Sequence, residues 1–292
     1  TVSVGAGPVP ARWPERAKRD YGLVLWGHST GWLINHGSIA VTRAYGVDNG
    51  RNTLDDNGRW MNMPTMARVL GKQVHWKFIL ADCCNFMCLE SLYELRSVVD
   101  YIIGSPAEIP SEGAPYQTVV PAMFNGADDF YCGVTDSHFA HLLYGLTVPL
   151  SVVKTSEMAA VAQATRTAQR AISSSLGSSY AELSGLIHYY NTDTQYDAVY
   201  NVFYDAGDYV RKLAPAAYPA WRQAFDRAVV YKRFTAKWNT NKQWASFYTD
   251  FTATEERYHG VSMYVPQDPS KGAYARYASN IKQMGWYYAV WQ

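Results

Sequence analysis

Three short apolar runs, each followed by a polar or glycine-rich loop, constrain the fold of this chain more than any other feature. They are YGLVLW at 21–26, WKFILA at 76–81 and DYIIG at 100–104. Uninterrupted apolar runs of this length, bounded by glycine and polar residues, are typical of buried strands. The stretch between the last two runs, 85–99, has apolar residues at helical spacing. This order of elements predicts an α/β fold with a mostly parallel sheet.

The second half of the chain continues with elements in a less regular order. Its pattern predicts strands at 151–154 and 260–265, and the chain as a whole has further predicted helices at 62–70, 156–174, 196–213, 217–232 and 272–284. We therefore expect a linker or a remnant of an N-terminal region at 1–20, a core at 21–150, and a C-terminal part at 151–292. This last part, with its additional helices and strands, belongs to the same domain or packs closely against it.

Size and charge exclude several classes of protein. A chain of 292 residues can bury a sizeable core, so a folded enzyme is possible. Its 26 basic residues balance 25 acidic ones, and no basic patch or stripe of the kind that binds nucleic acid is present. No apolar run approaches the length of a membrane span. The first residues, TVSVGAGPVPARW, lack the charged start and apolar centre of a signal peptide.

The four cysteines do not form a pattern of disulfide or zinc ligands. Cys83, Cys84 and Cys88 lie within six residues, and Cys132 stands apart. A disulfide framework would spread cysteines along the chain, and structural zinc sites use CxxC pairs or Cys/His clusters. We therefore expect no metal site, and we expect Cys88 and Cys132 to be inert core residues.

A histidine and two cysteines follow neighbouring predicted strands. His28 comes directly after the first run and opens a glycine-containing turn, and Cys83 and Cys84 follow the second run. In parallel α/β sheets, ligands bind at the carboxyl ends of strands, where these side chains would meet. A histidine beside a cysteine is the pair that nucleophilic catalysis requires. A helix starting near Asn85 would lower the pKa of the nearby thiol through its dipole.

Other interpretations of these residues stay open at this point. A loop histidine is often structural, and cysteines are among the most buried residues, so His28, Cys83 and Cys84 can all be part of the scaffold. The strand argument does not decide which cysteine faces the crevice. Asp82 ends a buried strand, where a carboxylate is costly unless it is paired or faces a pocket. It either caps the following helix or forms a charged pocket floor for a Lys or Arg side chain.

Several blocks of the sequence resemble a known family. LVLWGHSTGW, ILADCCNFMCLESLYELR, VDYIIGSPAEIPSEGAPY, SVVKTSEMAAVAQA and GVSMYVP occur in the order seen in clostripain-family cysteine peptidases of gut Bacteroidetes, members of the caspase-like clan. The resemblance covers about residues 20 to 284. It implies a caspase-like α/β/α sandwich and an enzyme that cleaves peptide bonds after Arg or Lys.

The resemblance assigns roles to individual residues. It implies His28 and Cys84 as the catalytic pair, with Cys83 in a slot that usually holds a small residue. Asp82 matches the acidic residue that binds the basic side chain of the substrate, and Glu112 matches a second acidic position near the pocket mouth. The backbone N–H groups of Ser29 and Cys84 would form the oxyanion hole. The family usually has glycine where Ser29 stands, and serine fits less well if φ is positive.

Further expectations come from the family. Members are often activated by self-cleavage between the His and Cys blocks. That loop contains Arg43–Ala44 and Arg51–Asn52 here, and the position after the His favours a cut at Arg43–Ala44. Relatives carry strands upstream of the first run, so an N-terminal fragment of the same precursor is an expected partner beside the peptide substrates. Relatives are exported, and we expect the same here. No cofactor is expected, although calcium is plausible by resemblance. The alternatives are an impaired member that only binds peptides, and an acyl or thiol transferase.

Overall fold

The computed structural model describes residues 20–34, 44–48, 59–141, 147–189, 203–238, 251–271 and 274–292. The predicted linker at 1–20 therefore lies almost entirely outside the described residues. None of the helices in these ranges is long and apolar enough to cross a membrane.

A five-stranded sheet forms the centre of the molecule. Its order is β1 (Gly22–Gly27), β4 (Trp76–Cys83), β5 (Val99–Gly104), β6 (Leu150–Lys154) and β8 (Val229–Arg233). The first three strands are parallel to one another, β6 runs antiparallel to β5, and β8 runs antiparallel to β6. The predicted α/β fold with a mostly parallel sheet is confirmed.

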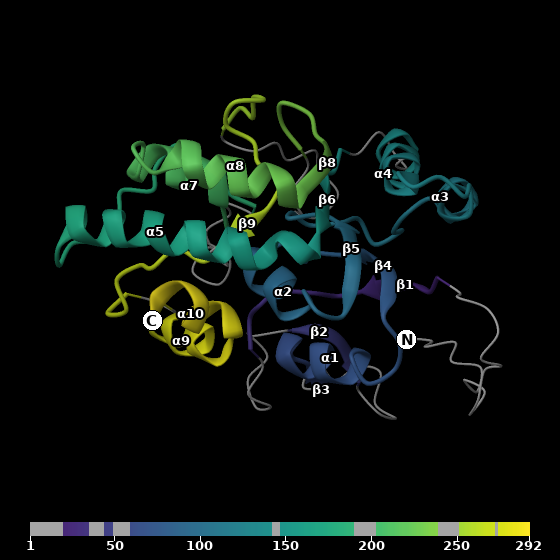
Figure 1. Cartoon of the computed structure of the whole chain (residues 1–292), viewed down its shortest axis with the longest axis horizontal. Coiled ribbons are helices and arrows are strands. Elements are labelled where there is room, and N and C mark those ends of the chain that lie inside the picture. The colour runs from purple at the N-terminus through teal and green to yellow at the C-terminus, as the bar shows by residue number, and fades with distance from the viewer. Residues whose placement is uncertain are drawn as a thin grey trace.

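Helices cover both faces of this sheet, and the alternation of side chains along β4 shows why. Ile79, Ala81 and Cys83 face the larger apolar cluster, whereas Phe78 and Leu80 face the smaller one. The helices on the larger side are α1 (Met63–Leu70), α2 (Leu89–Glu94), α5 (Met158–Leu176), α7 (Ala206–Leu213), α8 (Tyr218–Ala228), α9 (Tyr274–Asn280) and α10 (Gly285–Trp291). The helices on the smaller side are α3 (Tyr116–Met123) and α4 (Phe130–Ala140), which lie together at the right of Figure 1.

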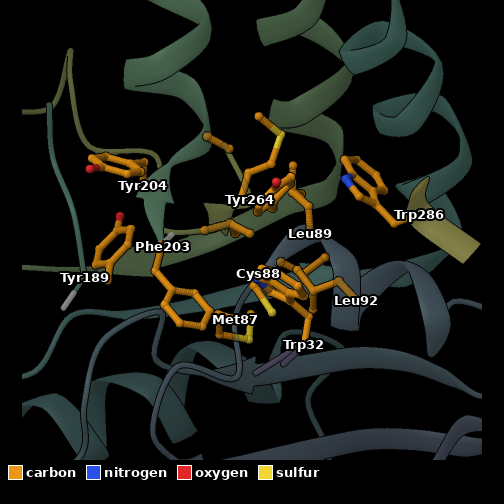
Figure 2. Packing of buried hydrophobic residues seen from close by; sticks show 14 of the residues in the cluster. Trp32, Met87, Cys88, Leu89, Leu92, Tyr189, Phe203, Tyr204, Tyr264 and Trp286 are labelled. Carbon is orange, nitrogen blue, oxygen red and sulfur yellow. The ribbon is translucent and has the colours of Figure 1, made fainter. Parts of the chain in front are cut away.

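The larger cluster extends across the chain, from Trp32 near the first strand to Val290 in the last helix. Around α2, the rings of Trp32 and Trp286 pack with Cys88 and Leu92 (Figure 2). Residues 21–150 and 151–292 thus share one sheet and one core.

Two short strand pairs complete the described elements. β2 (Tyr45–Asp48) and β3 (Arg59–Met61) form an antiparallel pair, and so do β7 (Tyr204–Asp205) and β9 (Ser262–Met263). β9 is the short core of the strand predicted at 260–265. Its first residue, Ser262, also donates a backbone hydrogen bond to Met87 O, which joins this late segment to the turn after β4.

Several elements differ from the prediction, and the helix predicted at 196–213 begins only at Ala206, after β7. β1 pairs with β4 alone among the described strands, so Val24 and Trp26 on one face are exposed instead of buried. The helix predicted at 85–99 is reduced to α2, because Asn85 adopts a φ of +54° and the backbone from 85 to 87 bonds to the loop after β5. The helix predicted at 217–232 ends with α8, and its last residues form β8, because they pair with β6.

Candidate active site

The register of β1 and β4 brings the two predicted catalytic residues to neighbouring positions. Gly27 pairs with Cys83 in the parallel ladder, so His28 and Cys84 are the next residue on each strand. Neighbouring strands lie about 4.8 Å apart, which puts the two backbones side by side. The side chain of His28 is exposed. A histidine and a cysteine thus emerge together at the carboxyl end of the sheet.

Burial distinguishes the two adjacent cysteines. Cys83 is 1% exposed and faces the larger apolar cluster, whereas Cys84 is partly exposed. The Sγ atom of Cys84 accepts a hydrogen bond from Ile109 N at 3.3 Å and lies 3.6 Å from Ile109 O. Cys84 is therefore the more exposed of the two cysteines.

The pKa of Cys84 differs from the sequence-based expectation. Burial, and then the charge of Glu108, raise this pKa to about 12. The expected helix dipole is absent from the thiol's position, because α2 begins at Leu89 with Cys88 as its N-cap. The prediction that a helix starting near Asn85 lowers the pKa is wrong. At neutral pH the thiol carries its proton, and a base is required to remove it.

Asp82 lies one position before the cysteine pair, on the face of the sheet covered by α3 and α4. It is 2% exposed, and its Oδ2 atom accepts hydrogen bonds from Ala114 N at 2.7 Å and from Tyr116 Oη at 2.6 Å. The other oxygen, Oδ1, has no hydrogen-bond partner among the described residues. Asp82 does not act as a cap for α2, which begins seven residues later. A buried carboxylate with one unpaired oxygen favours an added cationic partner.

Glycine is required where the loop after β5 approaches Asp82. Gly113 has a φ of +71°, and a Cβ atom there would lie 2.5 Å from Asp82 Oδ2 and 2.6 Å from Trp26 Nε1. Only a residue without a side chain lets the backbone come this close. The loop that supplies Ala114 N to the carboxylate thus depends on Gly113.

Trp26 and Tyr116 are site residues that the sequence analysis missed. Trp26 pairs with Asp82 in the ladder, so both side chains leave the same face of the sheet, and the indole is 47% exposed. Burial and the neighbouring carboxylate of Asp82 raise the pKa of Tyr116, which keeps its hydroxyl as a donor. The sequence signal for Trp26 was its position two residues before His28. Only the register of β1 and β4 shows that Trp26 lies beside Asp82.

Ser29, the residue predicted for the oxyanion hole, has an unstrained backbone. Its bridge to Tyr45 is made by His28 O, which accepts from Gly46 N, and by Thr30 N, which donates to Ala44 O. This pairing leaves the N–H of Ser29 out of the bridge. In the described residues Asn85 is the non-glycine residue with positive φ, so Ser29 does not adopt the conformation that would require glycine.

The remaining predicted residues lie outside this group or at its rim. Glu112 is exposed, and its carboxylate accepts a hydrogen bond from Ser111 Oγ at 3.3 Å. The carboxylate whose charge raises the pKa of Cys84 most is that of Glu108, a residue that was not predicted from the sequence. Arg43 lies outside the described residues. Ala44 is fully buried, and its carbonyl is the acceptor of Thr30 N.

The other two cysteines are away from this chemistry. Cys88 is buried and donates to Ser91 Oγ at 3.1 Å, and Cys132 lies on α4; all four cysteines are free thiols. Within the described ranges, no group of three or more His, Cys, Asp or Glu side chains can hold a metal ion.

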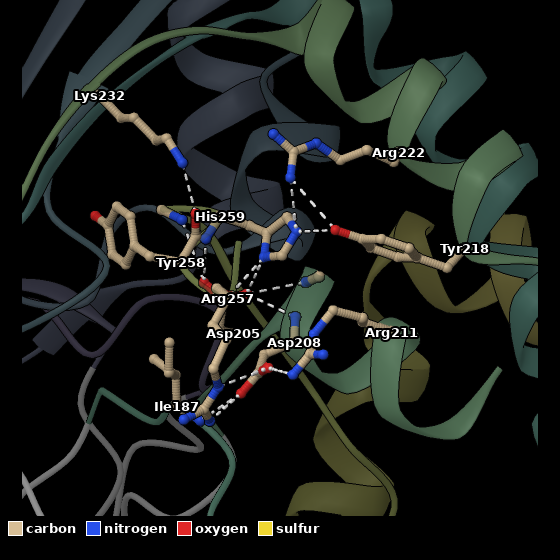
Figure 3. A network of polar contacts seen from close by, with 12 residues as sticks. Ile187, Asp205, Asp208, Arg211, Tyr218, Arg222, Lys232, Arg257, Tyr258 and His259 are labelled. Atoms are coloured by element: carbon tan, nitrogen blue, oxygen red, sulfur yellow. Dashed lines mark hydrogen bonds and ion pairs between the residues drawn. The ribbon is translucent and has the colours of Figure 1, made fainter. Parts of the chain in front are cut away.

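A second histidine–carboxylate pair lies in the C-terminal part. Asp205 Oδ1 is 2.9 Å from His259 Nδ1 (Figure 3), and Asp205 Oδ2 accepts from Tyr189 Oη at 2.6 Å. The side chains of Asp205 and His259 are completely buried. A substrate cannot reach this pair, so we assign it to the scaffold.

The chain is similar to known proteins in both sequence and fold. The model of the clostripain family (Peptidase C11) matches residues 15–292. A secreted C11 cysteine protease of Bacteroides thetaiotaomicron, solved with an irreversible peptide inhibitor, has a TM-score of 0.72 and 25% identity over 93% of this chain and 72% of its own. An inactive zymogen C11 protease of Parabacteroides distasonis has a TM-score of 0.72 and 30% identity over 94% of this chain and 70% of its own.

A third similar structure is a cysteine protease of B. fragilis, with a TM-score of 0.68 and 27% identity over 83% of this chain and 96% of its own. A search of curated proteins gives no significant match.

Proposed function

Because this chain belongs to the clostripain family of cysteine proteases, we propose that it is an endopeptidase that cleaves peptide bonds after arginine or lysine. The observation that carries the proposal is the juxtaposition of Asp82 and Cys84. A buried carboxylate with an unpaired Oδ1 atom stands two residues from a partly exposed thiol. Such an oxygen selects a cationic side chain, and charge-assisted hydrogen bonds to a guanidinium are among the strongest.

The proposed reaction starts with proton transfer. The pKa of the Cys84 thiol is raised to about 12, so His28 takes the thiol proton as Sγ attacks the carbonyl carbon of the substrate. The negative charge moves to the carbonyl oxygen, where the N–H groups of Ser29 and Cys84 stabilise it. His28 then gives the proton to the leaving amine, and a thioester to Cys84 forms. Water attacks this thioester, which releases the acid product and restores the thiol.

A covalent probe with a basic recognition group tests this proposal. A peptidyl acyloxymethyl ketone ending in Lys or Arg is expected to alkylate the wild-type protein at Cys84, as shown by peptide mass mapping. Cys84→Ala should not be labelled, and the matched variant Cys83→Ser should be labelled like wild type, because Cys83 is buried. A folded wild-type protein that resists the probe would instead support the peptide-binding alternative.

The pocket assignment has its own test. Asp82→Asn keeps the size of the side chain but removes the charge that attracts the basic group. We expect cleavage of Arg and Lys substrates to fall by at least about a hundredfold in kcat/KM, which is the cost of about 2.7 kcal/mol of transition-state binding. Thermal unfolding of the variant shows whether the fold is kept. Unchanged kcat/KM in a folded variant would refute the role of Asp82.

We also propose self-cleavage after Arg43. Ala44, the residue that follows the cut, is anchored to Thr30, two residues beyond His28. This hydrogen bond supports the proposal because Thr30 follows β1 closely, and the burial of Ala44 means that the strand pair must open first. Incubated wild-type protein should split after Arg43, whereas Cys84→Ala should stay intact. Equal splitting of both proteins would assign the cut to another protease.

The wider setting follows from the relatives. One similar B. thetaiotaomicron enzyme is described as secreted. We propose that this protein is also exported and acts on peptides or proteins with exposed basic residues, without nucleic acid as a partner. An N-terminal fragment of the same precursor is a proposed partner of the core. We propose that the reaction needs no cofactor, and calcium dependence is tested by assaying activity with and without a chelator.

A further inference from the structure

The inner face of α4 carries three side chains at intervals of four residues: Phe130, Val134 and His138. Phe130 packs against β4, because its ring centroid lies 5.1 Å from that of Phe78, and Val134 belongs to the same apolar cluster as Leu80. The third position of an otherwise apolar stripe is a histidine.

From the spacing of the two elements we infer that this histidine lies near Asp82. From Phe78 to Asp82 the strand advances about 13 Å, and from Phe130 to His138 the helix advances about 12 Å. Asp82 leaves the same face of β4 as Phe78, so the stripe that begins with two aromatic rings ends with an imidazole and a carboxylate. The charge of Asp82 acts on His138, which supports this placement.

Both groups are buried and incompletely bonded. His138 is 1% exposed, and neither its Nδ1 nor its Nε2 atom has a hydrogen-bond partner among the described residues. Asp82 Oδ1 also has none. An imidazole and a carboxylate oxygen that both lack partners within one buried region have unused hydrogen-bonding capacity, which is costly unless a function retains it.

The protonation state of His138 decides whether its ring can form a hydrogen bond with Asp82 Oδ1. Burial lowers the pKa of His138, and the carboxylate of Asp82 opposes this effect without reversing it. At neutral pH the imidazole is uncharged and leaves Asp82 with its full negative charge. In acid the imidazole is protonated, so both ring nitrogens become hydrogen-bond donors and the ring carries a positive charge near Asp82.

We propose that His138 is a specificity-determining residue of the pocket: uncharged, it leaves Asp82 Oδ1 to the basic group of the substrate, and protonated, it takes that oxygen for itself. The inference rests on the proposed role of Asp82 and adds a competitor inside the protein for the same carboxylate. Basic substrates then bind more weakly as pH falls below the pKa of His138.

The other charged groups around α4 do not replace this partner. From β8, Tyr231 and Arg233 bond to Asp136, which lies two residues before His138 on the helix. From α3, Tyr116 donates its hydroxyl to Asp82 Oδ2. The residues that β5 and β6 add to this cluster, Ile103 and Val152, are apolar. The carboxylate of Asp82 is thus the group through which protonation of His138 reaches the pocket.

Benzamidine, a small cation that stays charged over the whole range, measures this competition directly. Its Kd is determined by calorimetry from about pH 8 to about pH 5 in full-length Cys84→Ala protein, in which neither catalysis nor self-cleavage interferes. With His138 present, we expect Kd to rise by about tenfold for each pH unit below the histidine pKa. In H138Q this rise should be absent. Parallel curves for the two proteins would overturn the inference.

Two further variants separate this inference from the proposed function. H141Q removes a histidine near the end of the same helix and should behave like the parent protein. D82N should lose benzamidine binding at every pH. Binding that survives in D82N, or a parent protein that does not bind benzamidine at about pH 8, would contradict the proposed function and the inference with it.

A spectroscopic measurement covers the case in which H138Q does not fold. In the Cys84→Ala protein with carbon-13-labelled histidine, saturating benzamidine should lower the pKa of His138, because the bound cation replaces the proton as the partner of Asp82. An unchanged His138 titration, with benzamidine bound, would overturn the inference.

Discussion

Cys84 holds its thiol in surroundings that favour the protonated form. Burial raises the pKa to about 12, and the carboxylate of Glu108 adds to this effect. Two backbone groups of Ile109 border the sulfur, and only its N–H favours the thiolate. A protonated thiol reacts slowly with alkylating agents, and in the proposed mechanism its reactivity depends on His28 and on substrate binding.

The contribution of Glu108 can be measured by alkylation. In Glu108→Gln the negative charge near the thiol is lost, so the pKa of Cys84 falls and more thiolate is present at any given pH. We expect the rate of iodoacetamide modification of Cys84 at neutral pH to rise by about two- to tenfold, since one pKa unit changes the thiolate population tenfold. Mass mapping assigns the reaction to Cys84.

Glu112→Gln is the matched control for this experiment, because Glu112 lies in the same loop and its exposed carboxylate is bonded to Ser111. Its rate of alkylation should equal that of wild type. Equal acceleration in both variants would indicate a general effect of loop charge, and no acceleration in Glu108→Gln would show that burial alone raises the pKa.

At the scale of elements, helix α2 contains an ionisable side chain, Glu90, that is buried away from water. Glu90 is completely buried, its Oε1 atom accepts from Tyr264 N at 2.7 Å, and Oε2 has no partner in the described parts of the chain. Burial raises the pKa of Glu90 to about 8. The folded protein therefore holds a neutral carboxylic acid at pH 7, where the unfolded chain carries a carboxylate.

This shift predicts how stability depends on pH. Because the folded pKa exceeds the unfolded value, the stabilising contribution is complete below about pH 4.5 and is lost as pH rises through about 8. Glu90→Gln removes the titration and keeps an acceptor for Tyr264 N. We expect its free energy of unfolding at about pH 8 to exceed that of wild type, with a difference on the order of a few kcal/mol. Urea unfolding at several pH values measures it.

The exposed Glu256→Gln variant should follow the wild-type profile, since its carboxylate is 77% exposed. If the profile of Glu90→Gln is also parallel to that of wild type, Glu90 is not the group that titrates on unfolding.

Elements were predictable from the sequence where local pattern and tertiary environment agree. The apolar runs that form β1, β4 and β5 were identified because short apolar runs bounded by polar residues are typical of strands. β8 was missed because VVYKR follows α8 without a break, and only pairing with β6 turns it into a strand. α2 was predicted too long because the bonds from 85–87 to the loop after β5 override helical spacing.

The residues of the candidate site also divide into those that local sequence pattern indicates and those that only tertiary contacts bring to the site. His28, Cys84 and Asp82 were predictable because their residue types at strand ends match a chemistry and a family pattern. Trp26, Tyr116, Glu108 and His138 were not selected, because they reach the site through strand register, a loop approach at Gly113 and helix packing. These contacts join residues far apart in the chain, and no local pattern encodes them.

At the scale of the whole molecule, one buried carboxylate joins three distant segments of the C-terminal part. Asp205 caps α7 by accepting from Gly207 N and Asp208 N, and it accepts from the backbone N–H of His259 (Figure 3). It also accepts from Tyr189 Oη. This network holds β9, which in turn bonds to the turn that follows Cys84. The scaffold around the thiol therefore depends on a residue more than a hundred positions away.

Replacement of this carboxylate should destabilise the whole protein. Asp205→Asn keeps the shape but turns an amide NH2 toward groups that are themselves donors, so we expect a loss of about 3–5 kcal/mol in the free energy of unfolding at neutral pH. Urea unfolding measures this loss. The control Asp226→Asn removes an exposed partner of Arg222 and should cost less than about 1 kcal/mol. A loss of similar size in both variants would contradict the anchoring role of Asp205.

The acid limb of the stability profile provides an independent check on the same carboxylate. Burial alone would raise the pKa of Asp205, but the charge and hydrogen bond of His259, together with the hydrogen bond from Tyr189, lower it below the usual value. Its contribution is therefore present above the unfolded pKa of about 3.9 and is lost as pH falls through the folded value. The difference in stability between wild type and Asp205→Asn should accordingly narrow only in strong acid. A difference that already closes at about pH 6 would assign the loss to the titration of a histidine instead.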